Sequence, residues 1–114
     1  MYLLDTNVCI IYLKSRNLRL KERLEATNPQ NIAVCSVVKA ELFYGAMRSQ
    51  DPSRNLVLQQ EFLERFISLP FDDRAAGFFG EVRSELARED QITELYGQNL
   101  TFYIIAACYT YRQG

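Results

Sequence analysis

Short apolar runs, each followed at once by a polar residue and then by a helical pattern, constrain the fold of this chain most strongly. Residues 1–4 and 32–35 have the length and composition of strands that are buried on both faces. Asp5 follows the first run, and Ser36 follows the second. Strands of this kind, alternating with helices, predict a parallel sheet covered by helices on both faces.

Helical patterns follow both of these strands. We expect helices over residues 7–14 and 18–26, before the second strand. The Ser36 hydroxyl is expected to cap a helix that begins at Val37 and carries Glu41. The order of strand, helix and strand therefore indicates that the first two strands belong to one parallel sheet.

The same order continues in the second half of the chain. Pro52 suits the first turn of a helix. The apolar face of this helix is expected to consist of Leu58, Phe62, Leu63 and Phe66. A short strand is expected over residues 67–71, and Asp72 or Asp73 is expected to cap the next helix. The apolar positions of that helix are Ala75, Phe79, Val82 and Leu86.

This topology places two carboxylates at one edge of the sheet. Asp5 directly follows the first strand, and Glu41 lies about one and a half turns into the helix after the second. Ligands of open α/β sheets bind outside the carboxyl ends of the strands. A carboxylate there is costly to bury without a cation, and Mg²⁺ or Mn²⁺ suits oxygen ligands. The alternative makes Asp5 a helix cap and Glu41 a solvated helix residue.

Composition excludes several classes of catalytic site. The 114 residues include no histidine, which removes histidine-based triads and zinc sites built on histidine. Cys9, Cys35 and Cys108 are too widely spaced for a zinc motif and are expected to be buried free thiols. Any enzyme activity of this chain is therefore expected to depend on carboxylates.

Charge and hydropathy limit the partners of the chain. The formal net charge is -1, so contact with a nucleic acid requires a local basic patch. Residues 14–23 hold five Lys or Arg residues and are one candidate, although a solvated helix face, partly balanced by Glu22 and Glu25, is the simpler interpretation. Asp5 interrupts the apolar start, and no run is long enough to span a bilayer. We expect a cytoplasmic protein without a membrane anchor.

Three stretches of the chain carry a resemblance to a known family. They are YLLDTNVCIIYLK (residues 2–14), IAVCSVVKAELFYGAMRS (32–49) and LPFDDRAAGFFGEVRSELAR (69–88). Together they resemble the PIN-domain family, in particular the VapC-type toxins of bacterial toxin-antitoxin pairs. The resemblance implies a single domain over residues 1–114 with an α/β fold, a three-layer α/β/α sandwich around a central parallel sheet.

The resemblance also implies a function. Members of the family are endoribonucleases that hydrolyse RNA with Mg²⁺ or Mn²⁺ held by acidic residues. Asp5 and Glu41 match two of the metal ligands, and Thr6, Asn7 and Ser36 match positions that hold the substrate or the metal-bound waters. The implied partners are the RNA substrate, a cognate antitoxin protein and a second copy of the chain in a homodimer.

The C-terminal quarter departs from the family pattern. Residues 1–89 are family-like, whereas residues 90–114 read as a divergent, truncated or frameshifted tail that omits the last strand. Phe102 stands three positions before Ile105, where the family carries an aspartate. Substitute acids are available in this part of the sequence, although solvated surface charge is the simpler interpretation. They are Glu85, Glu89, Asp90 and Glu94.

Two alternatives to a nuclease follow from these residues. The first is a catalytically impaired PIN-like module that binds antitoxin or dimerises, because the later acidic ligands are absent. The second is a phosphotransferase or phosphatase that uses Asp5 as its nucleophile, resembling the haloacid-dehalogenase class. That class carries a second aspartate where this chain has Asn7, so its pattern fits less well. RNA cleavage by the purified chain would separate the nuclease from both.

Overall fold

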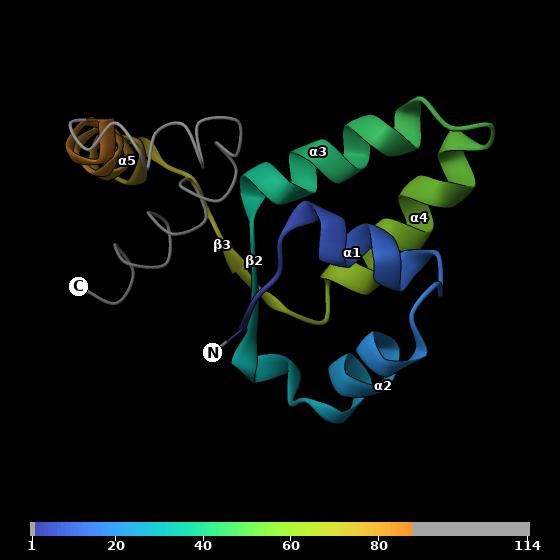
Figure 1. Cartoon of the computed structure of the whole chain (residues 1–114). Coiled ribbons are helices and arrows are strands. Elements are labelled where there is room, and N and C mark those ends of the chain that lie inside the picture. Colours follow the sequence, from blue (N-terminus) through green and yellow to red (C-terminus); the bar gives the residue numbers. More distant parts are fainter. Residues whose placement is uncertain (1, 88–114) are drawn as a thin grey trace.

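The fold is an α/β arrangement built on a parallel sheet, as the order of apolar runs predicts. A computed structural model describes residues 2–87 (Figure 1). The three strands are β1 (Tyr2–Leu3), β2 (Ile32–Cys35) and β3 (Ile67–Leu69), in the spatial order β1-β2-β3 within the described part. All are parallel: Tyr2 pairs with Ile32, and Ala33 pairs with Ile67.

Five α-helices connect and follow these strands in the described range. They are α1 (Thr6–Leu13), α2 (Leu18–Ala26), α3 (Ser36–Met47), α4 (Pro52–Leu63) and α5 (Asp73–Ala87), with a 3-10 turn at Pro29–Asn31. In Figure 1, α1, α3 and α4 lie on one side of the strands and α5 lies on the other. This arrangement confirms the predicted sheet with helices on both sides.

Side chains that accept hydrogen bonds from backbone N–H groups fix where the helices begin. Asn17 Oδ1 accepts from Leu20 N at 3.1 Å at the start of α2. Asp51 and Asp72 cap α4 and α5 in the same way, and Pro52 occupies the first turn of α4 as predicted. Each cap satisfies one of the N–H groups that a helix start leaves unpaired. The predicted helix over residues 18–26 is confirmed to the residue.

The core lies where α3 and α4 pack on the central strand. All four residues of β2 are buried, as expected for a strand with both faces covered. Val38, Leu42 and Ala46 recur every four residues on α3 and are buried, and the first two belong to the same core cluster as β2. Cys9 and Cys35 are buried free thiols, as predicted, whereas Cys108 lies outside the described residues.

Several local predictions need correction. The third strand ends at Leu69 rather than at residue 71. Helix α4 ends at Leu63, so Phe66 lies beyond the helix, and Leu58 is 46% exposed rather than part of a buried face. Tyr44 on α3 is 63% exposed. Helical spacing alone did not identify which side of α3 or α4 meets the sheet.

Candidate active site

The carboxyl ends of β1 and β2 position the candidate site. Leu4 N donates to Ala33 O at 3.1 Å, which extends the pairing of β1 with β2 to the residue before Asp5. The first residue of α3, Ser36, follows Cys35 at the end of β2. Because the strands are parallel, both helices begin at the same edge of the sheet. Asp5 and α3 therefore meet where α/β folds bind their ligands.

Asp5 is the N-cap of α1. Its Oδ1 accepts a hydrogen bond from Val8 N at 2.8 Å, and its backbone is extended, with φ -88° and ψ 173°. The side chain is exposed. An ionised carboxylate has about four lone-pair sites, so this one hydrogen bond orients the group without using its full capacity. The cap explains how Asp5 is held and is compatible with a ligand role.

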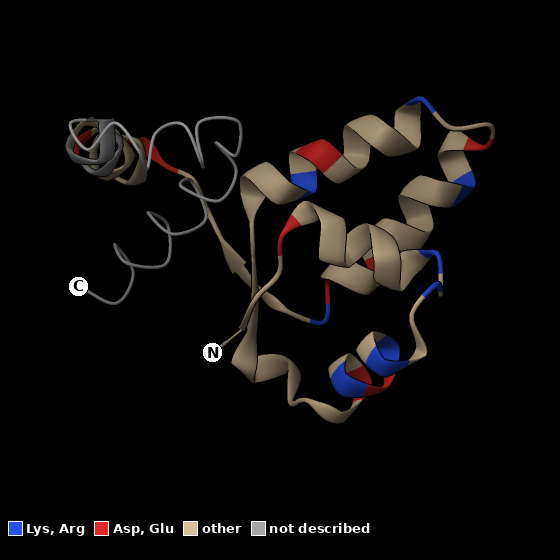
Figure 2. Ribbon diagram, viewed as in Figure 1, with Lys and Arg blue, Asp and Glu red and all other residues tan. Residues whose placement is uncertain are grey.

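Thr6 connects the start of α1 to Glu41. The Thr6 Oγ1 hydroxyl donates to Glu41 Oε2 at 3.1 Å, across 35 residues of sequence. Helix α1 packs against α3, which brings these two side chains together. Figure 2 shows the acidic segment at the start of α1 beneath the acidic turn of α3. The hydrogen bond thus places Glu41 beside Thr6, the residue that follows Asp5.

Ser36 and Asn7 have different surroundings from those of Thr6. The Ser36 hydroxyl donates to Leu69 O at 3.4 Å, joining α3 to β3. The residue before it, Cys35, takes the N-cap position without a side-chain cap bond, so the prediction that Ser36 caps the helix is wrong. Asn7 is exposed in the first turn of α1. Neither side chain hydrogen-bonds to Asp5 or Glu41 among residues 2–87.

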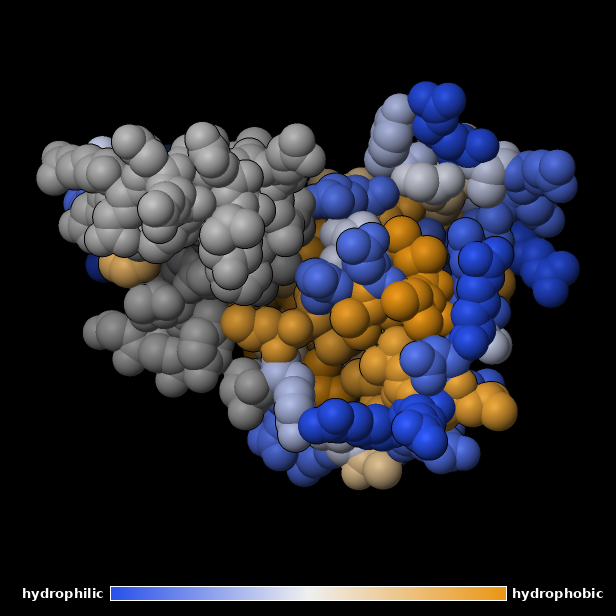
Figure 3. Space-filling model, viewed as in Figure 1, coloured by the Kyte–Doolittle hydropathy of each residue, from blue (hydrophilic) through white to orange (hydrophobic). Residues whose placement is uncertain are grey.

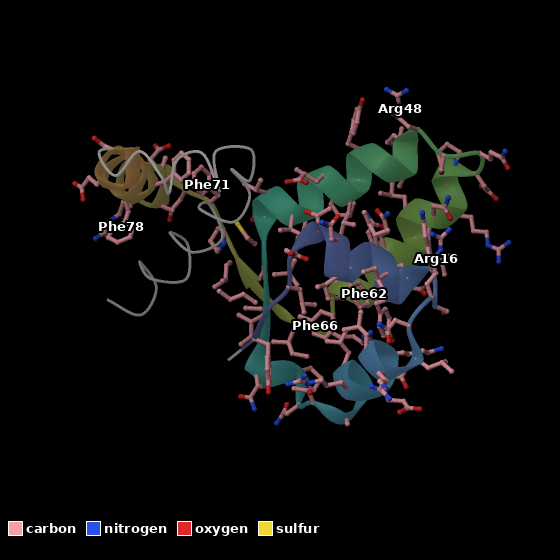
Figure 4. The ribbon with its side chains drawn as sticks, in the orientation of Figure 1. Arg16, Arg48, Phe62, Phe66, Phe71 and Phe78 are labelled. Carbon is pink, nitrogen blue, oxygen red and sulfur yellow. The ribbon has the colours of Figure 1, made fainter. Side chains whose placement is uncertain are left out.

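Lys39 lies two residues before Glu41 on α3 but bonds in another direction. Its Nζ donates to Ser68 Oγ at 2.8 Å, so it fastens α3 to β3. Arg48 stands at the far end of α3, where its Nη1 donates to Tyr44 Oη at 2.9 Å (Figure 4). Neither cation contacts Asp5 through a hydrogen bond in the described structure. Of these two cations, Lys39 is nearer to Glu41 along the helix.

The donor set suits a hard divalent cation but is small. Asp5 and Glu41 provide carboxylate oxygens, which Mg²⁺ prefers, and Mg²⁺ commonly binds one or two carboxylates together with waters and substrate phosphate. Residues 2–87 contain no group of three or more acidic, cysteine or histidine ligands. Glu89, Asp90 and Glu94 lie outside the described residues, and the side chain of Glu85 is likewise not described. The two acids therefore fit a site completed by water and phosphate.

A buried thiol lies beneath Asp5. Burial raises the pKa of Cys9 from 9.0 to about 12, and the nearby Asp5 carboxylate adds to the effect. The raised pKa disfavours the thiolate, which is the form of cysteine that acts as a nucleophile or metal ligand. Its role at this edge of the sheet is to fill space.

The basic segment lies apart from the carboxylates. Residues 14–23 run from the end of α1 into α2, at the opposite end of α1 from Asp5. Figure 4 shows Arg16 at that far end, and Arg23 lies over the ring of Tyr2 at 5.8 Å. A track for nucleic acid from this segment to Asp5 would run the length of α1.

No helix in the described range has the length and apolar character of a membrane span.

Sequence comparison decides the family. The sequence model of the PIN-domain family matches residues 2–110 of the chain. The chain belongs to the PIN-domain family. The match passes residue 89, where the predicted divergent tail begins, and the nature of that tail stays a prediction.

Two relatives with assigned activities are similar to this PIN-domain chain. A tRNA(fMet)-specific endonuclease VapC from Shigella flexneri is 40% identical over 88 residues, covering 77% of this chain and 66% of the relative. Ribonuclease VapC2 from Haemophilus influenzae is 36% identical over 98 residues, covering 86% and 71%. The chain thus spans about two-thirds of the length of these curated relatives.

Solved PIN-domain structures share the fold. The crystal structure of DNA-bound VapBC from Salmonella typhimurium superimposes with a TM-score of 0.76 at 33% identity, covering 94% of this chain and 76% of that one. VapBC2 from Rickettsia felis, bound to a promoter DNA fragment, gives 0.76 at 29% identity, covering 94% and 78%. These similarities confirm the predicted α/β/α class of fold.

Proposed function

We propose that this PIN-domain chain is an endoribonuclease toxin of a toxin-antitoxin pair, which hydrolyses RNA phosphodiester bonds with Mg²⁺ or Mn²⁺ at Asp5 and Glu41. One observation carries the proposal: the 3.1 Å hydrogen bond from Thr6 to Glu41 brings the second acid to the residue next to Asp5. The ribonuclease names of relatives from Shigella flexneri and Haemophilus influenzae support the reaction class.

The chain holds its two carboxylates by separate means. Val8 N fixes Asp5 Oδ1, and the Thr6 hydroxyl fixes Glu41 Oε2. Both acids are exposed, so an RNA strand can approach them from solvent. A divalent cation, when bound, lowers the pKa of water and neutralises charge on the phosphate. Asp5 and Glu41 would hold that cation, and the position of Thr6 keeps Glu41 directed at it.

The test is RNA cleavage by the purified chain with added Mn²⁺ or Mg²⁺. Asp5→Asn and Glu41→Gln are each expected to lower the rate more than about 100-fold, because each removes a charged ligand. Asp51→Asn is a matched control, since Asp51 caps α4 as Asp5 caps α1 and asparagine caps equally well. Glu61→Gln, on the exposed side of α4, is the control for Glu41. Equal rates in all five proteins would refute the assignment.

A binding module is the second candidate. It is favoured by Phe102, which stands in the sequence where the family carries an aspartate, and by the VapBC complexes of structural relatives. The cognate antitoxin is the proposed partner in both cases, and a homodimer in the cytoplasm is the proposed state of the toxin. No cleavage with either metal, combined with tight antitoxin binding, would select the module.

A further inference from the structure

A groove lies beside the proposed site, between α1, α3 and α4. Its volume is about 320 Å³, and Glu41 is among the residues that line it. The apolar part of the lining comes from three helices and includes Ile10 and Leu13 of α1, Leu42 of α3 and Leu58 of α4. Figure 3 shows apolar surface over α1, with hydrophilic residues around it. The volume is at the lower end of the range for small-ligand sites, which are apolar with a few polar groups.

Gln59 supplies an unpaired polar atom to this groove. Its Oε1 is buried, and no donor among residues 2–87 reaches it. The neighbouring polar groups are engaged, since Asn55 Nδ2 donates to Ser49 Oγ at 2.8 Å and Ser49 Oγ donates to Ala46 O at 2.6 Å. Buried acceptors without a partner are rare because each one is costly. The Gln59 amide therefore points to a ligand that brings a hydrogen-bond donor.

We propose that the groove holds one base of the RNA substrate, next to the bond that is cut, and that Gln59 reads the edge of that base. This inference rests on the proposed ribonuclease function. Glu41 belongs to both the groove and the proposed metal site, so a phosphate at Glu41 places its nucleotide at the mouth of the groove. The aliphatic walls contact the flat faces of the base, and Lys14 lies at the groove for an adjoining phosphate.

A base fits both the apolar and the polar lining of the groove. A helix docked by its apolar side would cover Ile10 and Leu58, but its backbone N–H groups are already bonded within the helix, so it could satisfy Gln59 Oε1 only through a polar side chain. Base edges carry exocyclic and ring N–H donors, which pair readily with a side-chain amide. Gly45 adds room, because a Cβ built there meets no atom within 4 Å.

Mapping of cleavage positions tests the proposal. Random-sequence single-stranded RNA is cut by wild type, Gln59→Leu and Gln60→Leu, and the product ends are sequenced. Gln60 is the matched control, because it is the next residue of α4, is exposed and does not line the groove. Wild type and Gln60→Leu are expected to favour particular bases at one position beside the cut. In Gln59→Leu that preference is expected to fall about tenfold while cleavage continues. An unchanged preference overturns the proposal.

A second measurement does not depend on cleavage. The side-chain amide resonances of Gln59 are followed by NMR in the wild-type chain during titration with each of the four nucleoside monophosphates. At least one is expected to shift the Gln59 signals saturably while leaving those of Gln60 in place. Cleavage of RNA without any such shift refutes the groove inference and leaves the proposed function standing. A saturable shift without cleavage supports the groove and refutes the nuclease.

Occupation by a protein partner is the remaining outcome. A helical peptide that shifts Gln59, in a chain whose base preference survives Gln59→Leu, would make the groove a docking site for protein and overturn the proposal. Urea unfolding of both variants shows whether the substitution has altered the fold. Should Gln59→Leu fail to fold, the wild-type titration alone decides.

Discussion

The two ends of helix α1 are held by different kinds of contact. At its first turn, Thr6 and Asp5 make exposed polar contacts, including the 3.1 Å hydrogen bond to Glu41. At its last turn, the Tyr12 ring stacks on Phe62 with centroids 4.7 Å apart and an interplanar angle of 25°. Phe62 in turn meets the edge of Phe66 at 5.0 Å. The candidate site thus occupies the lightly held end of a helix that is fixed at its other end.

Arg65 strengthens the aromatic end. Its guanidinium lies 5.1 to 5.7 Å from the ring centroids of Tyr12, Phe62 and Phe66. It also donates to Tyr12 Oη at 3.3 Å, and Tyr12 Oη donates to Glu25 of α2. Figure 4 shows Phe62 and Phe66 between α1 and α2. Packing of this kind fixes the direction of α1, so the polar end can stay open to ligands without losing its position.

Removal of the aromatic anchor should produce the largest effect on stability. Phe62 is 5% exposed, so Phe62→Ala leaves a cavity between α1 and α4 and is expected to lower the free energy of unfolding by about 3–5 kcal/mol. Urea denaturation measures it. Val57→Ala on the same helix, at a half-exposed position, should cost less than about 0.5 kcal/mol. A loss below about 1 kcal/mol for Phe62→Ala would mean that α1 is held elsewhere.

Raising the pH should lower the stability of the fold through Cys9, which lies in the middle of α1. Burial raises the pKa of Cys9 to about 12 in the folded chain, against 9.0 as the ordinary value. The unfolded chain therefore loses this proton first as the pH rises, so stability is full below pH 9 and falls between pH 9 and 12. Between pH 8 and pH 10 the free energy of unfolding should drop by about 1.4 kcal/mol through this group.

Cys9→Ala is the reference for that measurement. The variant lacks the thiol, so the stability difference between wild type and variant should shrink by the same amount between the two pH values. Tyrosines and lysines titrate alike in both proteins and cancel in the difference. A difference that stays constant from pH 8 to pH 10 would contradict the buried, protonated state of Cys9.

Alteration of the polar end should change stability least. Thr6→Val keeps the shape of the side chain and removes the hydroxyl that bonds Glu41, so the free energy of unfolding should change by no more than about 0.5 kcal/mol. Mn²⁺ affinity is expected to weaken about tenfold, as when an outer group that orients a ligand is lost. Isothermal titration calorimetry measures it.

Thr27→Val is the matched control for Thr6→Val, since the Thr27 hydroxyl donates only to a backbone carbonyl of α2, at 2.7 Å. It should leave Mn²⁺ affinity unchanged. Equal losses of affinity in the two variants, or a large loss of stability in Thr6→Val, would erase the contrast between the ends of α1.

Local features were predictable to the residue in several places. The strand at residues 32–35 and the helix at 18–26 match their predicted bounds, because apolar runs and capping residues act over three or four positions. Asp5 was predicted at the end of a strand, and it caps α1 there. The role of Ser36 was mispredicted because α3 begins at Ser36 itself, so Cys35 takes the N-cap position and the Ser36 hydroxyl donates to Leu69 O of β3.

The sequence by itself determined the parallel α/β order of elements, the starts of α2, α4 and α5, the exclusion of histidine chemistry and the two acids after neighbouring strands. These depend on composition and on contacts between near neighbours in the chain. Only the tertiary structure decided that Thr6 bonds Glu41, that Tyr44 is exposed and that Gln59 rather than Gln60 faces a groove. The physical reason is that the crossing and rotation of packed helices select the buried side, and no local pattern contains that choice.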